Sequence, residues 1–167
     1  MLSVNEEDYS FTIGHRDFFI HRIYGHHDTQ YTMSQRIVPR GIRNNNPLNI
    51  RIGNTWLGER PHPTDPSFEE FVTIEYGYRA AFQILRRYIR RYKKNTIAQI
   101  VSTWAPPIEN KTQRYIDYVS NAMGIAPDVP ILYEDEKTMT QLVAAMQMME
   151  CGVPADLKKV ARGYSMA

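Results

Sequence analysis

The chain has 167 residues, of which 43% are hydrophobic and 23% charged, and its formal net charge is +2. This composition is typical of a globular domain and excludes collagen-like and disordered proteins. The small net charge argues against a strongly basic nucleic-acid wrapper or an acidic tail protein, although it leaves room for a local patch. A single cysteine, Cys151, excludes an intramolecular disulfide and a cysteine-clustered zinc site. We expect no membrane span, because the longest apolar run has only about eight residues.

Residues 1–35 differ from the remainder of the chain. They contain four of the five histidines and no sustained hydrophobic period, although residues 18–24 favour a short strand or helix. The first eight residues are acidic and lack an apolar core, so we expect no secretory signal and expect the chain to be made in a cytoplasm. We therefore predict an N-terminal extension over residues 1–35 and a compact domain over 36–167.

The compact domain opens with a turn-rich segment and two predicted strands. Residues 41–47 are rich in Gly, Asn and Pro, which favour turns. Apolar and polar residues alternate over 48–52, and residues 68–72 form a second short apolar segment. The sequence thus predicts a small antiparallel sheet with a long loop, which would form one wall of a cleft.

The chain beyond residue 75 has helical periodicity. An apolar stripe runs from Tyr78 to Tyr92, and Pro and Gly residues punctuate the later segments. We predict about five helices, at residues 78–94, 96–104, 110–123 and 135–150 and in a short segment beginning near residue 154. The expected fold class is α+β and mainly helical.

Glu150 is the leading candidate for a catalytic role. It falls roughly 80° from Leu142 on a helical wheel, among apolar side chains. Apolar surroundings and the negative end of the helix dipole both raise the pKa of a carboxyl group, which suits a general acid. The alternative is a partly solvated glutamate at a frayed helix end, with no role.

Amide and aromatic residues supply candidates for sugar binding. Asn45, Asn46 and Asn49 offer hydrogen-bond donors and acceptors, and the indole of Trp56 can accept the apolar face of a pyranose. The alternative is that these asparagines only shape the backbone turn. Trp104 and Glu109 would line the same cleft, or else serve as a core residue and an exposed carboxylate beside a helix cap.

The remaining polar clusters are interpreted without special chemistry. Arg and Lys residues between 86 and 94 make one helix face basic, which could attract nucleic acid, anionic lipid or an anionic cell-wall polymer. We interpret it as a solvated face and expect no nucleic-acid partner, with DNA binding as the alternative. The histidines lack a recognised ligand spacing, and no phosphate-binding glycine loop is found. We therefore expect neither a metal nor an organic cofactor.

Two sets of motifs resemble known families. The first comprises Arg-Gly-Ile-Arg-Asn-Asn-Asn-Pro at 40–47, Trp-x-Gly at 56–58, Phe-x-x-Phe at 68–71, Gly-x-Arg-Ala at 77–80 and the segment 104–112. It resembles a family of phage and prophage virion structural proteins over residues 36–163. That resemblance implies a phage context, with other virion proteins as partners, and says little about chemistry.

The second resemblance is to flagellar-type glucosaminidases of the lysozyme superfamily, through Asn-Asn-x-x-x-Ile-Arg at 45–51 and the motifs that follow it. In those enzymes a helix ending in the catalytic glutamate precedes this turn, whereas here the similar helix, 142–152, comes last. The resemblance implies a circularly permuted lysozyme-like domain with Glu150 as the acid. Cys151 departs from the polar residue usual at its position.

Together these features predict cleavage of the peptidoglycan glycan strand, by a muramidase, glucosaminidase or lytic transglycosylase, in a virion or at the bacterial cell wall. Asp65 and Glu69 are weak candidates for a second carboxylate. The alternative function is a non-catalytic virion structural or cell-wall-binding protein that keeps the fold.

Overall fold

The computed structural model describes residues 10–13, 16–19, 38–105 and 109–167. The chain divides into two units, Met1–Ile37 and Val38–Ala167. In the first unit, strands β1 (Ser10–Ile13) and β2 (Arg16–Phe19) pair antiparallel, with Ser10 opposite Phe19. The remainder of the short element predicted at 18–24, together with His15, His21, His26 and His27, lies outside the described residues.

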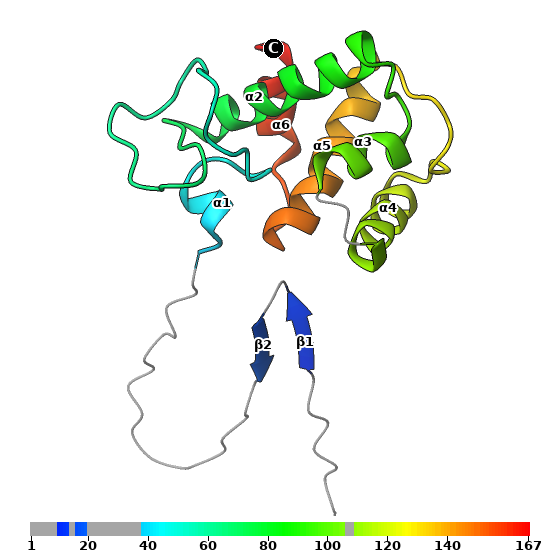
Figure 1. Cartoon of the computed structure of the whole chain (residues 1–167), viewed down its shortest axis with the longest axis horizontal. Helices are drawn as coiled ribbons and strands as arrows, with labels where there is room; N and C mark the ends of the chain where they lie inside the picture. Colours follow the sequence, from blue (N-terminus) through cyan, green and yellow to red (C-terminus); the bar gives the residue numbers. More distant parts are fainter. Residues whose placement is uncertain (1–9, 14–15, 20–37, 106–108) are drawn as a thin grey trace, which may run out of the picture. The chain divides into compact units, whose positions relative to one another are not determined.

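The second unit is built mainly from helices (Figure 1). They are α1 (Arg40–Arg43), α2 (Ile74–Arg86), the π-helical turn η1 (Arg87–Arg91), α3 (Ile97–Trp104), α4 (Glu109–Met123), α5 (Glu136–Cys151) and α6 (Leu157–Ser165). The prediction of a mainly helical domain is confirmed, and the five predicted helices correspond to α2 with η1 and to α3 through α6. Within the described ranges, no helix is long and apolar enough to cross a membrane.

Side-chain caps fix where these helices begin and end. Thr96 and Gln99 form a reciprocal capping box at the start of α3. The side chain of Asp135 accepts a hydrogen bond from the Thr138 amide at the start of α5. Helix α5 ends at Gly152, whose φ of 64° is the left-handed conformation that favours glycine.

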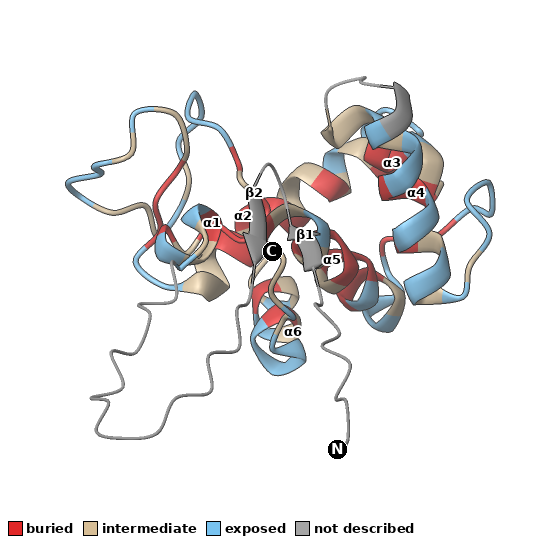
Figure 2. Ribbon diagram, turned by 90° about the horizontal axis from the view of Figure 1, so that it is seen from below, coloured by how far each residue is buried: buried red, intermediate tan, exposed pale blue. Residues whose placement is uncertain are grey.

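The helices bury their apolar stripes in one core (Figure 2). Helix α2 packs against α6, where Gly163 lies so close that a Cβ atom on it would come within 2.3 Å of Tyr78. Helix α5 contacts both α4 and α6. The largest fully buried side chains include Tyr78, Phe71, Phe82, Leu85, Ile100, Met139, Leu142 and Met146.

The apolar stripe of α2 ends earlier than its spacing predicts. Ile89, within the π-helical turn η1, is still part of the core, whereas Tyr92, expected inside, is 50% exposed. The reason is the π-helical turn η1, because a π turn contains more residues than an α turn and rotates later side chains away from the core.

The sheet predicted within the compact domain does not form. Between residues 48 and 72, which the structure describes throughout, there are only the isolated bridges Arg51↔Phe68 and Glu59↔Phe71. The Glu69 amide donates to the Ile50 carbonyl at 2.9 Å, but the buried side chain of Asn46 takes the place of further ladder partners. Its Nδ2 donates to the carbonyls of Ile50, at 2.8 Å, and Glu69, at 3.0 Å, and its Oδ1 accepts from the Ile50 amide, at 2.8 Å. A side-chain clamp therefore joins the two segments, and each strand is reduced to one pair.

This clamp predicts the effect of Asn46→Ala. The substitution leaves the Ile50 amide and the Glu69 carbonyl without their partner, while the Ile50 carbonyl keeps the Glu69 amide at 2.9 Å. We expect this to lower the free energy of unfolding by about 2–4 kcal/mol. Urea denaturation of the full chain measures this loss. Asn121→Ala, on the exposed surface of α4, is the control and should change stability little; equal stability of the two variants would contradict the clamp.

Candidate active site

The turn after α1 packs against the C-terminal end of α5, although about a hundred residues separate them. The Cys151 thiol donates a hydrogen bond to the Pro47 carbonyl at 3.2 Å. Gly41 leaves no room for a side chain, since a Cβ atom there would lie 2.6 Å from Cys151 Sγ. Burial, followed by the nearby Glu150 carboxylate, raises the pKa of Cys151 to about 12, so the thiol stays protonated and can donate.

Glu150 meets this turn at the end of α5. Asn49 Nδ2 donates to Glu150 Oε2 at 3.1 Å and to the Glu150 carbonyl at 3.3 Å. Asn49 reaches that position with a φ of 52°, a left-handed conformation that asparagine tolerates better than most residues. The structure thus brings together the acid and one of the three asparagines named from the sequence.

Tyr115 of α4 completes the surroundings of the Glu150 carboxyl group. Its hydroxyl has two acceptors at 3.3 Å, Glu150 Oε1 and the Met146 carbonyl, between which its single proton is shared. Burial raises the pKa of the half-buried Glu150 carboxyl, while the hydrogen bonds from Asn49 and Tyr115 act in the opposite direction. The group is therefore biased toward the protonated form, yet two donors hold it in one orientation.

Trp104 is bonded to the same turn. Its indole N–H donates to the carbonyl of Leu48, the residue before Asn49, at 3.3 Å. Its ring meets Tyr88 edge to face, with ring centroids 6.3 Å apart. The half-buried indole at the end of α3 is thus fixed to the residue that precedes Asn49.

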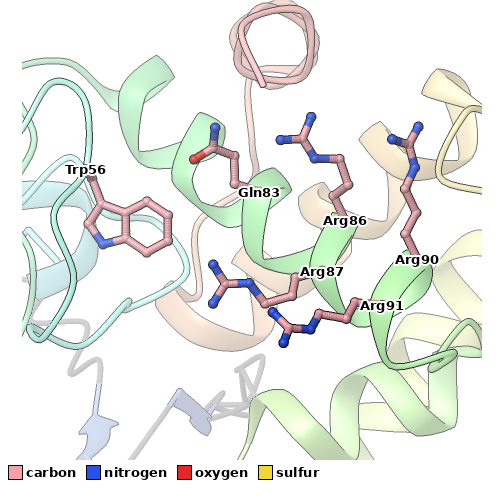
Figure 3. Close-up of a pocket in the computed structure, with 6 residues that line it drawn as sticks. All are labelled: Trp56, Gln83, Arg86, Arg87, Arg90 and Arg91. Carbon is pink, nitrogen blue, oxygen red and sulfur yellow. The ribbon is translucent and has the colours of Figure 1, made fainter.

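Other predicted sugar-binding residues lie elsewhere or make other contacts. Asn46 is fully buried in the clamp described above, and Asn45 Nδ2 donates to the Phe71 carbonyl at 3.0 Å. Trp56 lines a cavity with Gln83 and the arginines of α2 and η1 (Figure 3). The side chain of Glu109 falls outside the described part of the structure.

Asp65 and Glu69, the two weak candidates for a second carboxylate, differ in their surroundings. Asp65 pairs with the Arg40 guanidinium at 2.5 Å and accepts from Asn44 Nδ2 at 2.7 Å, and these contacts, the Arg40 bond first, hold its pKa well below the usual range. Glu69 is only 7% exposed, and burial, then repulsion from Glu59, raises its pKa. Asp65 is thus a weak base, and Glu69 is shielded from solvent.

Tyr115 was missed as a site residue because the sequence places it in the buried stripe of α4. It is indeed buried, at 6% exposure. A usable signal existed, since a buried tyrosine hydroxyl needs a hydrogen-bond partner and the helix of Glu150 is apolar on the facing side. The Trp56 cavity was missed because its parts come from a loop and a helix far apart in the sequence.

No protein-family model matches the chain. It is similar to Protein P5 of Pseudoalteromonas phage PM2, with 39% identity over 130 residues, which are 75% of this chain and 79% of that protein. The similarity confirms the phage part of the first resemblance.

The hydrogen bonds to Glu150 predict how its titration responds to substitution. Tyr115→Phe removes a donor that favours the ionised form, so the Glu150 pKa should rise further above its ordinary value. Carbon-13 NMR titration of the glutamate side chains measures this change. Tyr118→Phe, on the exposed part of α4, is the matched control and should leave the Glu150 pKa unaltered. A lower Glu150 pKa in the Tyr115→Phe variant than in wild type would contradict the assigned contact.

Proposed function

The chain belongs to the family of Protein P5 of phage PM2, and from this premise we propose that it cleaves the glycan strand of peptidoglycan during infection or lysis, with Glu150 as the general acid. The contact of Glu150 with Asn49 and Tyr115 is the observation that carries the proposal. The substrate is the cell wall, and the protein acts in the virion or at the wall.

Proton donation is the step that this site suits best. A carboxyl group whose pKa is raised by burial keeps its proton closer to neutral pH than a solvated one. In the proposed reaction Glu150 gives its proton to the glycosidic oxygen as the bond from that oxygen to the anomeric carbon breaks. The Asn49 amide and the Tyr115 hydroxyl then stabilise the carboxylate that remains, because both donate to its oxygens.

The second step follows the lytic transglycosylase route. Asp65 is tied to Arg40 and Glu69 is buried, so neither is well suited to activate a water molecule. A hydroxyl of the cleaved sugar instead attacks its own anomeric carbon and passes its proton to the Glu150 carboxylate. This ring closure restores the acid and needs one carboxyl group only.

The order of elements supports a circularly permuted lysozyme-like arrangement. The glutamate ends α5 late in the chain, while the asparagine turn that it contacts comes near the start of the compact domain. Asn49, which contacts the acid, and Trp104, which is bonded to the residue before Asn49, would position the sugar. Asn45, Asn46 and Trp56 make other contacts in this structure and take no part in the proposed step.

A specific observation favours a second candidate function. Both carboxylate oxygens of Glu150 already accept hydrogen bonds from the protein, and the two cavities described in this structure are lined by other residues. A virion structural or wall-binding protein without catalytic activity would retain these contacts of Glu150 with Asn49 and Tyr115. The two functions differ in whether bound peptidoglycan is cut.

Glu150→Gln tests the proposal. We expect wild type to release soluble glycan fragments from purified peptidoglycan, and the variant to be slower by about 10²–10⁴-fold, the usual contribution of a positioned acid. The fragments should end in an anhydro sugar, which is lighter by one water than the hydrolysis product and is identified by mass spectrometry. Glu136→Gln, exposed at the other end of α5, is the matched control and should cleave normally.

The stability of Glu150→Gln provides a second readout. A raised pKa means that protonation stabilises the fold, and this contribution is lost as the pH rises through the folded-state pKa, above the ordinary value of 4.5. The neutral glutamine should therefore leave thermal stability at pH 7 unchanged or higher. If wild type binds peptidoglycan without releasing fragments across a range of pH, the non-catalytic function is correct instead.

A further inference from the structure

A cavity of about 330 Å³ lies between the loop that carries Trp56 and the outer face of α2 and η1. Its volume is at the lower end of the range for small-molecule sites. The lining residues are Trp56, Gln83, Arg86, Arg87, Arg90 and Arg91 (Figure 3). Four guanidinium groups and one indole around one cavity are a specific combination, which the proposed glycan cleavage does not use.

The four arginines are not equally compensated. Arg90 pairs with Glu134 at 2.6 Å, and Arg86 donates to the Ala167 carbonyl oxygen at 2.9 Å. Within the described part of the chain, no ion pair involves Arg87 or Arg91, and both are exposed. Among the described residues no carboxylate therefore neutralises Arg86, Arg87 or Arg91. Arg86 is engaged by a backbone oxygen and Arg91 lies over the Tyr92 ring, at 5.7 Å, so Arg87 and Arg91 are the two charges of the cavity without a hydrogen-bond acceptor in the described residues.

The spacing of these two residues keeps their charges close together. Arg87 and Arg91 are four residues apart on one helical segment, where like charges repel and destabilise the helix. In Figure 3 both side chains extend toward the side on which Trp56 lies. An anion held between them would relieve this repulsion, and a phosphate group fits best because its several oxygens accept the paired N–H groups of two guanidinium groups.

Trp56 supplies the second feature of the ligand. Its half-buried indole borders the cavity opposite the arginines, and an indole face packs well against the apolar face of a sugar ring. Gln83 adds an amide that can bond a hydroxyl. We propose that this cavity binds a sugar phosphate, with the phosphate between Arg87 and Arg91 and the ring against Trp56.

This chemistry has two sources, a free sugar phosphate or a phosphorylated sugar of a bacterial surface glycan. Isothermal titration of the full chain at low ionic strength, with glucose 1-phosphate, inorganic phosphate and glucose as separate probes, tests the shared chemistry. Glucose 1-phosphate should bind more tightly than either of the other two. Competition by purified lipopolysaccharide that is lost after phosphatase treatment assigns the glycan source, and absence of competition assigns the free one.

Substitutions locate the site. Arg87→Gln with Arg91→Gln should weaken glucose 1-phosphate binding roughly tenfold or more, because the variant loses the charged hydrogen bonds from both guanidinium groups to the phosphate. Trp56→Ala should lower the affinity for glucose 1-phosphate several-fold but leave the affinity for inorganic phosphate unchanged. Lys158→Gln with Lys159→Gln, on the exposed face of α6, removes the same charge and should have no effect.

Three results would overturn the inference. They are the absence of saturable glucose 1-phosphate binding to wild type, an equal loss of affinity in the double arginine and double lysine variants, and an unchanged affinity in the double arginine variant. Far-UV circular dichroism checks that each variant is folded. Glu150→Gln should bind the probe as wild type does, so failure of this inference and failure of the glycan-cleavage proposal are distinguished.

Discussion

The contact between the asparagine turn and the last turn of α5 is the constraint on which the candidate site depends. Cys151 holds Pro47, and Asn49 holds Glu150, so two consecutive residues of α5 are each fixed to the turn. Position 41 requires glycine because a side chain there would collide with the Cys151 sulfur. The cysteine at position 151 thus has a structural explanation: a small, neutral donor fits this buried place.

The helical part of the fold could be predicted from the sequence because its signals are local. Apolar residues recur at helical spacing, and Thr96, Asp135 and Gly152 mark helix boundaries through side-chain caps or left-handed backbone. The sheet prediction was wrong because alternation over a few residues cannot reveal a competing side chain. Asn46 satisfies the backbone of both segments, and only the three-dimensional structure brings Glu69 within its reach.

The site was predicted less completely than the fold. The position of Glu150 at the apolar end of its helix could be worked out from periodicity, and the raised pKa agrees with that reasoning. Its partners could not be derived in the same way, because Asn49 and Tyr115 come from segments 101 and 35 residues away. Trp56 was grouped with the asparagines by closeness in sequence, yet the loop carries it to the arginines of α2 and η1.

The most direct measurement of the central claim is a crystal structure of the Glu150→Gln variant with a peptidoglycan tetrasaccharide. The account predicts that a glycosidic oxygen lies within hydrogen-bond distance of the residue 150 side chain, with a sugar close to Asn49 and Trp104. A tetrasaccharide bound only at another surface, with the contact between Asn49 and residue 150 closed as it is here, would contradict the assignment of Glu150 as the acid.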